Sequence, residues 1–202
     1  MTWLLFPGRH HALTRFQFDA LSRACAGEAV DLDGRPLKGR IEGIVWAVSS
    51  ANHERTRRNP LPAHRREAAI ERFGARLPVP SFVFYIDDLG ATARFAEYVV
   101  KKIEVESGGK LALTPRNTVV GCSTPEVLSL YESLGFRILP FELADRRGRK
   151  LLTRTPWQLL QGLVEAGRVD EAFERDAAPE TLDLYRRYGY AELVVDLHRH
   201  PV

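Results

Sequence analysis

The sequence has few cysteines and no long apolar run. Its two cysteines, Cys25 and Cys122, have no Cys-x-x-Cys spacing, which excludes a disulfide framework and a zinc signature. The N-terminal apolar run Trp3–Phe6 ends at Pro7 and is too short for a signal-peptide core or a membrane span. These absences predict a cytoplasmic protein that has no membrane partner.

The charge balance is also unremarkable. The net charge is +3, with 45% hydrophobic and 27% charged residues, a composition typical of a globular protein with a real core. A small positive charge fits an anionic ligand, but it is far below that of a protein that wraps nucleic acid. The length predicts one domain over residues 1–202, with a core over about 2–165 and a C-terminal extension over about 166–202.

Apolar runs and segments of helical period alternate along the first 140 residues. We expect strands at 2–6, 41–48, 81–86, 117–121 and 136–139, and helices at 14–26, 61–76, 91–106 and 123–135, the last with side-chain capping at its start. This alternation predicts an α/β fold, a Rossmann-like parallel five-stranded sheet with helices on both faces. The remaining segments comprise a turn-rich excursion at 29–40, a basic turn at 146–150, helices from 156 to 167 and from 179 to 187, and a final alternating strand or extended tail at 191–197. The sheet is therefore followed by a C-terminal helical appendage.

Ligands of parallel α/β sheets bind at the carboxyl ends of the strands. The loops expected there are 7–13, 49–62, 87–91 and 122–125. The segment Ser49–Glu67 is the most distinctive, because it carries five arginines, two histidines and two prolines between a buried strand and a helix. Such a segment can hold a phosphorylated ligand, or it can be a solvated basic loop.

The segment Ser49–Arg66 resembles a segment of archaeal-type nicotinamide-nucleotide adenylyltransferases, G-S-A-Q-E-S-H-T-x-x-N-P-F-T-A-G-E-R. Asn52 replaces the family's glutamine. The identical positions are Ser50, Ala51, Thr56, Asn59, Pro60, Ala63 and Arg66.

The N-terminal segment Gly8–Gln17 is similar to the G-R-F-x-P-x-[HT]-x-G-H motif of the wider H-x-G-H (cytidylyltransferase-like) nucleotidyltransferase superfamily. Gly8, Arg9 and Thr14 fit this motif, whereas Phe16 and Gln17 replace its last glycine and histidine. Three later motifs follow in the family's order: V-P-D-I at 86–89, N-N-P at 123–125 and I-S-x-T-x-I-R at 152–158. The resemblance covers about residues 2–165.

The resemblance implies adenylyl transfer from ATP to nicotinamide mononucleotide or a related phosphorylated acceptor in NAD biosynthesis, with release of pyrophosphate. Mg²⁺ would enter with ATP, without a dedicated protein site. Its ligands would be a nucleoside triphosphate and a mononucleotide-type small molecule, and a homo-oligomer is left open. The resemblance implies catalytic roles for Thr14 and Gln17, and His11 of the same loop is a third catalytic candidate. It implies nucleotide or phosphate contacts for Gly8, Arg9, Thr124, Thr153 and Thr155, to which the position of His10 in the first loop adds a further candidate. It implies acceptor contacts for Ser50, Asn52, Asn59, Pro60, Arg66 and Asp88, to which the position of Arg57 in the second loop adds a further candidate.

The departures from the family pattern leave two functions open. Phe16 is large, Gln17 is neutral, and Gln158 replaces the arginine of the last motif. Each lost charge-assisted contact is worth roughly 1.5–3 kcal/mol. The chain is either an active nucleotidyltransferase, in which His11, Arg9, Arg57 and Arg58 replace these contacts, or a catalytically inactive nucleotide-binding or regulatory protein of the same fold.

Overall fold

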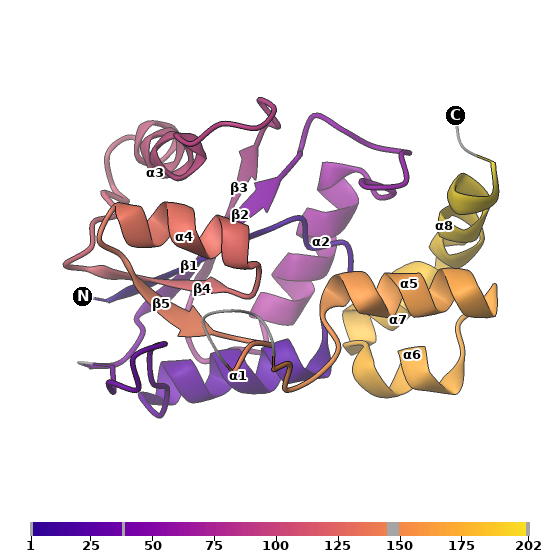
Figure 1. Cartoon of the computed structure of the whole chain (residues 1–202), viewed down its shortest axis with the longest axis horizontal. Helices are drawn as coiled ribbons and strands as arrows, with labels where there is room; N and C mark the ends of the chain where they lie inside the picture. The colour runs from indigo at the N-terminus through magenta and orange to yellow at the C-terminus, as the bar shows by residue number, and fades with distance from the viewer. Residues whose placement is uncertain (1, 38, 145–149, 201–202) are drawn as a thin grey trace.

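The computed structural model describes residues 2–37, 39–144 and 150–200. Five parallel strands form one sheet in the order β3-β2-β1-β4-β5 (Figure 1). The strands are β1 Trp3–Gly8, β2 Gly43–Ser49, β3 Ser81–Ile86, β4 Thr118–Cys122 and β5 Arg137–Pro140. The predicted five-stranded parallel sheet is therefore confirmed.

Helices cover both faces of this sheet, and each face has its own apolar core. The strands bury side chains on both faces because successive residues point to opposite sides. Leu4 and Phe6 of β1 pack with α1 Arg15–Ala26 and α2 Ala63–Gly74. Leu5 packs on the other face with α3 Phe95–Glu106 and α4 Pro125–Ser133. The expected helices on both faces are confirmed.

Four further helices lie beyond the sheet, next to α2 (Figure 1). They are α5 Pro156–Ala166, α6 Glu171–Asp176, α7 Pro179–Arg187 and α8 Tyr190–Arg199. The appendage is helical, as predicted, but the expected strand or tail at 191–197 is wrong because these residues belong to α8. Their apolar positions also fit a helix, since Ala191, Val194 and Val195 are buried at helical spacing.

Other boundaries differ in smaller ways. Strand β1 continues through Pro7, which pairs with β2 only, because pairing with β4 ends at Leu5. The missing N–H of proline therefore costs no ladder bond on the β4 side. Helix α4 begins at Pro125 without the expected side-chain cap from Thr124. The turn at 29–40 is closed by a bridge between Val30 and Pro36, whereas most of the basic turn predicted at 146–150 lies outside the described residues.

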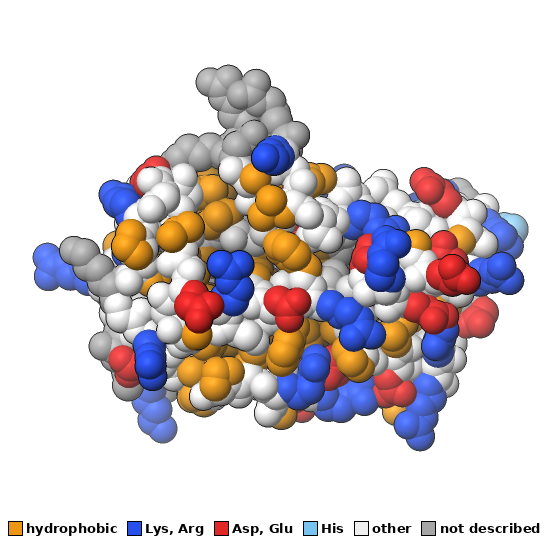
Figure 2. Space-filling model, turned by 90° about the horizontal axis from the view of Figure 1, so that it is seen from below, with side chains coloured by type: hydrophobic (Ala, Val, Ile, Leu, Met, Phe, Trp, Pro, Cys, Tyr) orange, Lys and Arg blue, Asp and Glu red, His pale blue; other side chains and the backbone are white. Residues whose placement is uncertain are grey.

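The surface carries charges of both signs. Figure 2 shows Lys and Arg side chains interspersed with Asp and Glu on the face seen from below. Cys25 and Cys122 are buried and free. In the described ranges, no helix is long and apolar enough to cross a bilayer.

Candidate functional site

A buried arginine joins the loops that follow β1 and β2. Arg66 of α2 is 0% exposed. Its Nη1 donates to the carbonyl of Arg9 at 3.0 Å and to that of Ser49 at 2.7 Å, and its Nη2 donates to the carbonyl of Ser50 at 3.0 Å. Burial lowers the pKa of this guanidinium to about 10, so it remains a cation. Arg66, predicted to contact the acceptor, instead holds the two loops together through their backbone.

Both loops contain a strained residue within two positions of the end of their strand. His10 has a φ of 53° and Ser50 a φ of 52°, in the left-handed region that non-glycine residues rarely adopt. Arg66 binds the carbonyl next to His10 and that of Ser50 itself. Such strain persists only where the surroundings over-determine it, and here it marks the carboxyl edge of the sheet as a constrained site.

The His10 imidazole folds back over the end of β1. Its Nε2 lies 3.1 Å from the Phe6 carbonyl oxygen, and its ring packs against Phe6 and Trp46. A Cβ at Gly8 would lie 3.1 Å from the His10 ring, so the glycine makes room for this side chain. Burial lowers the pKa of His10 to about 4. The imidazole is therefore neutral at pH 7 and supplies no positive charge to a phosphate.

His11 is also neutral and is more deeply buried. Its exposed fraction is 5%, and its Nε2 lies 3.4 Å from Asn59 Oδ1. Burial, followed by the nearby charge of Arg66, lowers its pKa to about 3. Its Nδ1 has no hydrogen-bond partner among the residues described. His11 thus cannot replace a lost phosphate-binding cation, although its free Nδ1 remains a hydrogen-bond acceptor.

Three residues predicted to bind the acceptor come together between β2 and β3. Ser50 Oγ donates to Asp88 Oδ2 at 3.1 Å, and the backbone N–H of Asp88 donates to Asn52 Oδ1 at 2.8 Å. The Gly90 N–H donates to Asp88 Oδ1 at 2.9 Å and lowers the pKa of that carboxyl. Asp88 is therefore ionised at pH 7 and able to accept hydrogen bonds from ligand hydroxyl or amide groups.

Arg9 is a cation close enough to this cluster to help lower the pKa of Asp88. It is partly buried, and its guanidinium makes no hydrogen bond or ion pair within 2–37, 39–144 and 150–200. Its pKa is lowered by burial and then by Arg58, while Asp88 opposes this effect. An anion between Arg9 and Arg58 would relieve their mutual repulsion.

The other predicted acceptor residues have structural partners. Arg57 Nε and Nη2 donate to the carbonyls of Leu197 and His198, at 3.2 and 3.1 Å. Two nitrogens of its guanidinium thus cap the end of α8. Asn59 is buried beside His11, and Pro60 is buried.

The segment Thr14–Gln17, which contains two of the predicted catalytic residues, is closed by its own hydrogen bonds. Thr14 is the N-cap of α1, and its Oγ1 accepts from the Gln17 N–H at 3.0 Å. Gln17 Oε1 accepts from the Thr14 N–H at 3.2 Å, and Gln17 Nε2 donates to Glu142 Oε1 at 2.9 Å. Both ends of the Gln17 amide are therefore engaged within the protein.

Glu142 is the residue that sequence reasoning missed. Its carboxylate is 1% exposed and accepts hydrogen bonds from Gln17 and from the Ser123 hydroxyl. Burial raises its pKa to about 7. The sequence carried one signal for this residue, an acidic side chain inside the apolar run Phe141–Ala144. A buried carboxylate without a cationic partner is rare, so such a residue marks a candidate site.

The remaining predicted phosphate residues lie at two helix starts. Thr155 Oγ1 accepts from the Gln158 N–H at 3.2 Å in the capping box of α5. Thr153 precedes this cap and is partly buried. Thr124 is at the N-cap position of α4 and makes no side-chain cap bond. Of these hydroxyl groups, Thr155 Oγ1 is already used by its own helix.

Comparison with known proteins agrees with this architecture. No family model matches the chain. The chain is 26% identical over 132 residues to a nicotinamide-nucleotide adenylyltransferase from Halorubrum lacusprofundi, a match that covers 61% of this chain and 68% of that protein. Its fold matches the crystal structure of a bifunctional NMN adenylyltransferase/ADP ribose pyrophosphatase from Francisella tularensis, complexed with AMP and a Mn ion, with a TM-score of 0.63 and 8% identity. The chain has the fold of a nucleotidyltransferase. The structural match covers 98% of this chain and 53% of the other, and both similarities confirm the predicted resemblance to the nucleotidyltransferase superfamily.

Within this nucleotidyltransferase fold, the C-terminal appendage holds the loop that follows β1. Thr181 Oγ1 accepts from the Leu13 N–H and donates to the Leu13 carbonyl, both at 2.8 Å. Tyr185 donates its hydroxyl to the His11 carbonyl at 3.0 Å. Helix α7 therefore fixes the backbone from His11 to Leu13, a role that the local sequence did not indicate.

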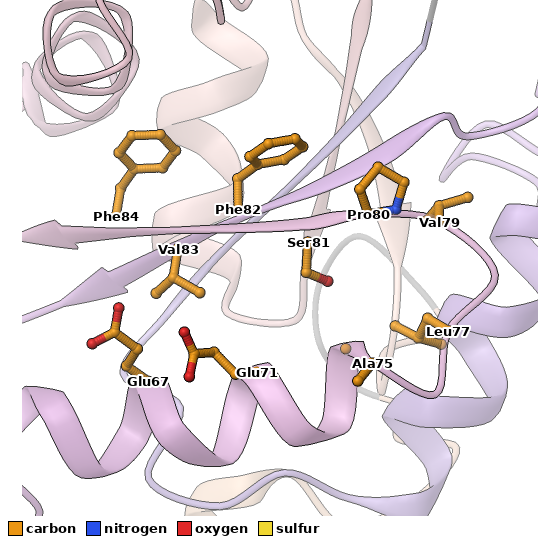
Figure 3. Close-up of a pocket in the computed structure, with 11 residues that line it drawn as sticks. Glu67, Glu71, Ala75, Leu77, Val79, Pro80, Ser81, Phe82, Val83 and Phe84 are labelled. Atoms are coloured by element: carbon orange, nitrogen blue, oxygen red, sulfur yellow. The ribbon is translucent and has the colours of Figure 1, made fainter.

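A groove of about 640 Å³ lies elsewhere on this nucleotidyltransferase fold, between α2 and the edge strand β3. Figure 3 shows Glu67 and Glu71 pointing from α2 toward Val83, with Phe82 and Phe84 on the other side of the strand. Two carboxylates make this groove unsuitable for a phosphorylated ligand. The candidate nucleotide site is therefore the carboxyl edge of the sheet, and not this groove.

Proposed function

We propose that the chain binds a mononucleotide-type acceptor at the Ser50–Asn52–Asp88 cluster and transfers an adenylyl group to it from ATP. The observation that carries this proposal is the meeting of these three residues beside the unpaired cation of Arg9. The sequence similarity to a nicotinamide-nucleotide adenylyltransferase supports nicotinamide mononucleotide as the acceptor to test.

The chemistry requires positioning and charge stabilisation more than covalent catalysis. An oxygen of the acceptor phosphate attacks the α-phosphorus of ATP, the bond from that phosphorus to the bridging oxygen breaks, and pyrophosphate leaves with the electron pair. Arg9 and Arg58 hold the acceptor phosphate, and Asp88 accepts from a sugar hydroxyl or an amide of the acceptor. No group of three His, Cys, Asp or Glu residues able to hold a metal occurs in the described part of the chain. In this proposal, as the family resemblance implies, magnesium enters with ATP as part of the MgATP substrate.

Pyrophosphate release from MgATP and nicotinamide mononucleotide tests this function, with the dinucleotide product identified by mass spectrometry. Arg9→Met should raise the KM for the acceptor about tenfold or more, because a charge-assisted phosphate contact is worth roughly 1.5–3 kcal/mol. Arg116→Met is the matched control, since this exposed arginine precedes β4 at the opposite edge of the sheet. A failure to turn over any nucleoside triphosphate above background would refute adenylyl transfer.

A second function is favoured by the closed state of the Thr14–Gln17 segment. Gln17 uses both ends of its amide internally, and the large Phe16 is partly exposed where the family has glycine. We propose as the alternative that the chain is a catalytically inactive nucleotide-binding or regulatory protein. It predicts saturable binding of a pyridine nucleotide in calorimetry, with no pyrophosphate release. Both functions fail if neither ATP nor a pyridine nucleotide binds.

A further inference from the structure

The strand order places a topological switch point between β1 and β4, where open α/β sheets form a ligand-binding crevice. The chain runs outward from β1 to β2 and β3, and it then returns to place β4 on the other side of β1. In open α/β sheets, ligands bind outside the carboxyl ends of the strands at such a switch point. In this protein, Gln17 follows β1 and Ser123 follows β4, so these two side chains mark the two sides of the crevice.

The chain itself covers this crevice. The segment Phe141–Leu143 leaves β5 and turns back over the neighbouring strands, and all three residues are buried. The ring of Phe141 stacks on Phe6 of β1 at a centroid distance of 4.6 Å. It also lies against β4, where a Cβ at Gly121 would come within 2.4 Å of the Phe141 ring. Phe141 therefore packs against both β1 and β4 in the core on the α1–α2 face, and it holds the covering segment over the switch point.

Glu142 places a carboxylate at the same point. One oxygen accepts from Gln17 Nε2 at 2.9 Å, on the β1 side, and the other accepts from the Ser123 hydroxyl, on the β4 side. The Glu142 N–H donates to Ser123 Oγ at 3.1 Å, which fixes the covering segment to β4. Neither oxygen has a cationic partner among the contacts of the described residues. A donor on each side of the switch point is thus satisfied by an internal anion.

We propose that Glu142 is an internal anion that competes with the phosphates of a nucleoside triphosphate for the crevice between β1 and β4. Two anions in the same water-poor space repel strongly, and a phosphate can take the donors of Gln17 and Ser123 only after Glu142 releases them. The acceptor cluster on the β2–β3 side is unaffected, because it does not contact the covering segment. The inference rests on the proposed function in taking a nucleoside triphosphate as the ligand of this crevice.

Calorimetric titrations of the whole chain at pH 8.5, where Glu142 is ionised, test this competition. Glu142→Gln removes the charge and keeps the shape of the side chain, and Glu126→Gln makes the same charge change at an exposed position in the first turn of α4. Each variant is titrated with inorganic tripolyphosphate, MgATP and nicotinamide mononucleotide. We expect Glu142→Gln to bind tripolyphosphate and MgATP at least tenfold more tightly than the wild type does. Mononucleotide affinity should stay within twofold, and Glu126→Gln should stay within twofold for every ligand.

The outcomes separate this inference from the proposed function. Unchanged or absent tripolyphosphate and MgATP binding in a folded Glu142→Gln protein overturns the inference, whereas mononucleotide binding in the same samples still supports the function. Tighter triphosphate binding without any mononucleotide binding supports the inference and argues against the function.

A wild-type measurement covers the case in which the variant does not fold. In NMR spectra, saturating tripolyphosphate should shift the side-chain amide signals of Gln17 as Glu142 releases them. Tripolyphosphate binding that leaves these signals unchanged would overturn the inference. The absence of any binding at tripolyphosphate concentrations on the order of several millimolar, which suit weakly bound anions, would also overturn it.

Discussion

Replacement of Arg66 by methionine should destabilise the protein strongly. The side chain is fully buried, and its three hydrogen bonds go to the carbonyls of Arg9, Ser49 and Ser50. Each buried carbonyl left without a donor costs about 1–3 kcal/mol. The variant recovers part of this loss, because a guanidinium no longer has to be removed from water. We expect the free energy of unfolding to fall by about 3–5 kcal/mol.

Urea unfolding at pH 7.5 measures this loss. With an m-value of about 2–3 kcal/mol/M, the midpoint should fall by about 1–2 M. Arg66→Lys should lose about half as much, since an ammonium keeps the charge but cannot reproduce the planar fork of donors. Arg65→Met is the control, because the neighbouring Arg65 is only partly buried. Its guanidinium lies over the Tyr188 ring, 5.1 Å from the ring centroid.

A second measurement separates the electrostatic role of Arg66 from its packing. The charge of Arg66 is one of the causes that lower the pKa of His11, so NMR titration of Arg66→Met should show a higher His11 pKa. If Arg66→Met lowers the free energy of unfolding by less than about 1 kcal/mol, no more than Arg65→Met does, the argument that this cation holds the two loops together is refuted.

Three further predictions concern other parts of the site. The Glu142 pKa rises from an ordinary 4.5 to about 7 on folding, so the stability that this group contributes at acid pH is lost as pH rises through this window. Glu142→Gln should flatten this pH dependence. Urea unfolding of the variant at pH 8 should show a free energy of unfolding higher by up to about 3 kcal/mol. Tyr185→Phe leaves the His11 carbonyl without its donor, and it should speed amide exchange in the loop after β1 without changing that of α4. Arg57→Met removes two bonds to the end of α8, and limited proteolysis should then cut that helix faster, whereas Arg116→Met should not.

The elements with strong local signals were predictable from the sequence. Strand β3 and helix α7 have the expected bounds, because Pro80 precedes the strand and Pro179 begins the helix. Helix α5 begins where Thr155 and Pro156 predict. The prediction of a strand or tail at 191–197 was wrong because a short apolar run fits both the strand period and the helix period. Only packing beside α5 and α7 selects the helix.

The site was less predictable because its charges act through distant partners. Sequence reasoning brought Ser50, Asn52 and Asp88 together correctly, since all three follow neighbouring strands. It could not distinguish the buried Arg66 from an arginine that binds phosphate, because the difference lies in three carbonyls that only the fold gathers. The same holds for Glu142, whose donors Gln17 and Ser123 lie far away in the chain.

The hydrogen bonds between α7 and the loop that follows β1 have a consequence for the synthesis of the chain. Leu13 and His11 obtain their partners from Thr181 and Tyr185, which follow them by 168 and 174 residues. The ribosome delivers residues from the N-terminus onward, so the residues of the sheet emerge while this loop still lacks its support. A nascent chain would then contain every residue of the acceptor cluster and yet hold no finished site. The loop after β1 would obtain these hydrogen bonds only when translation reaches α7.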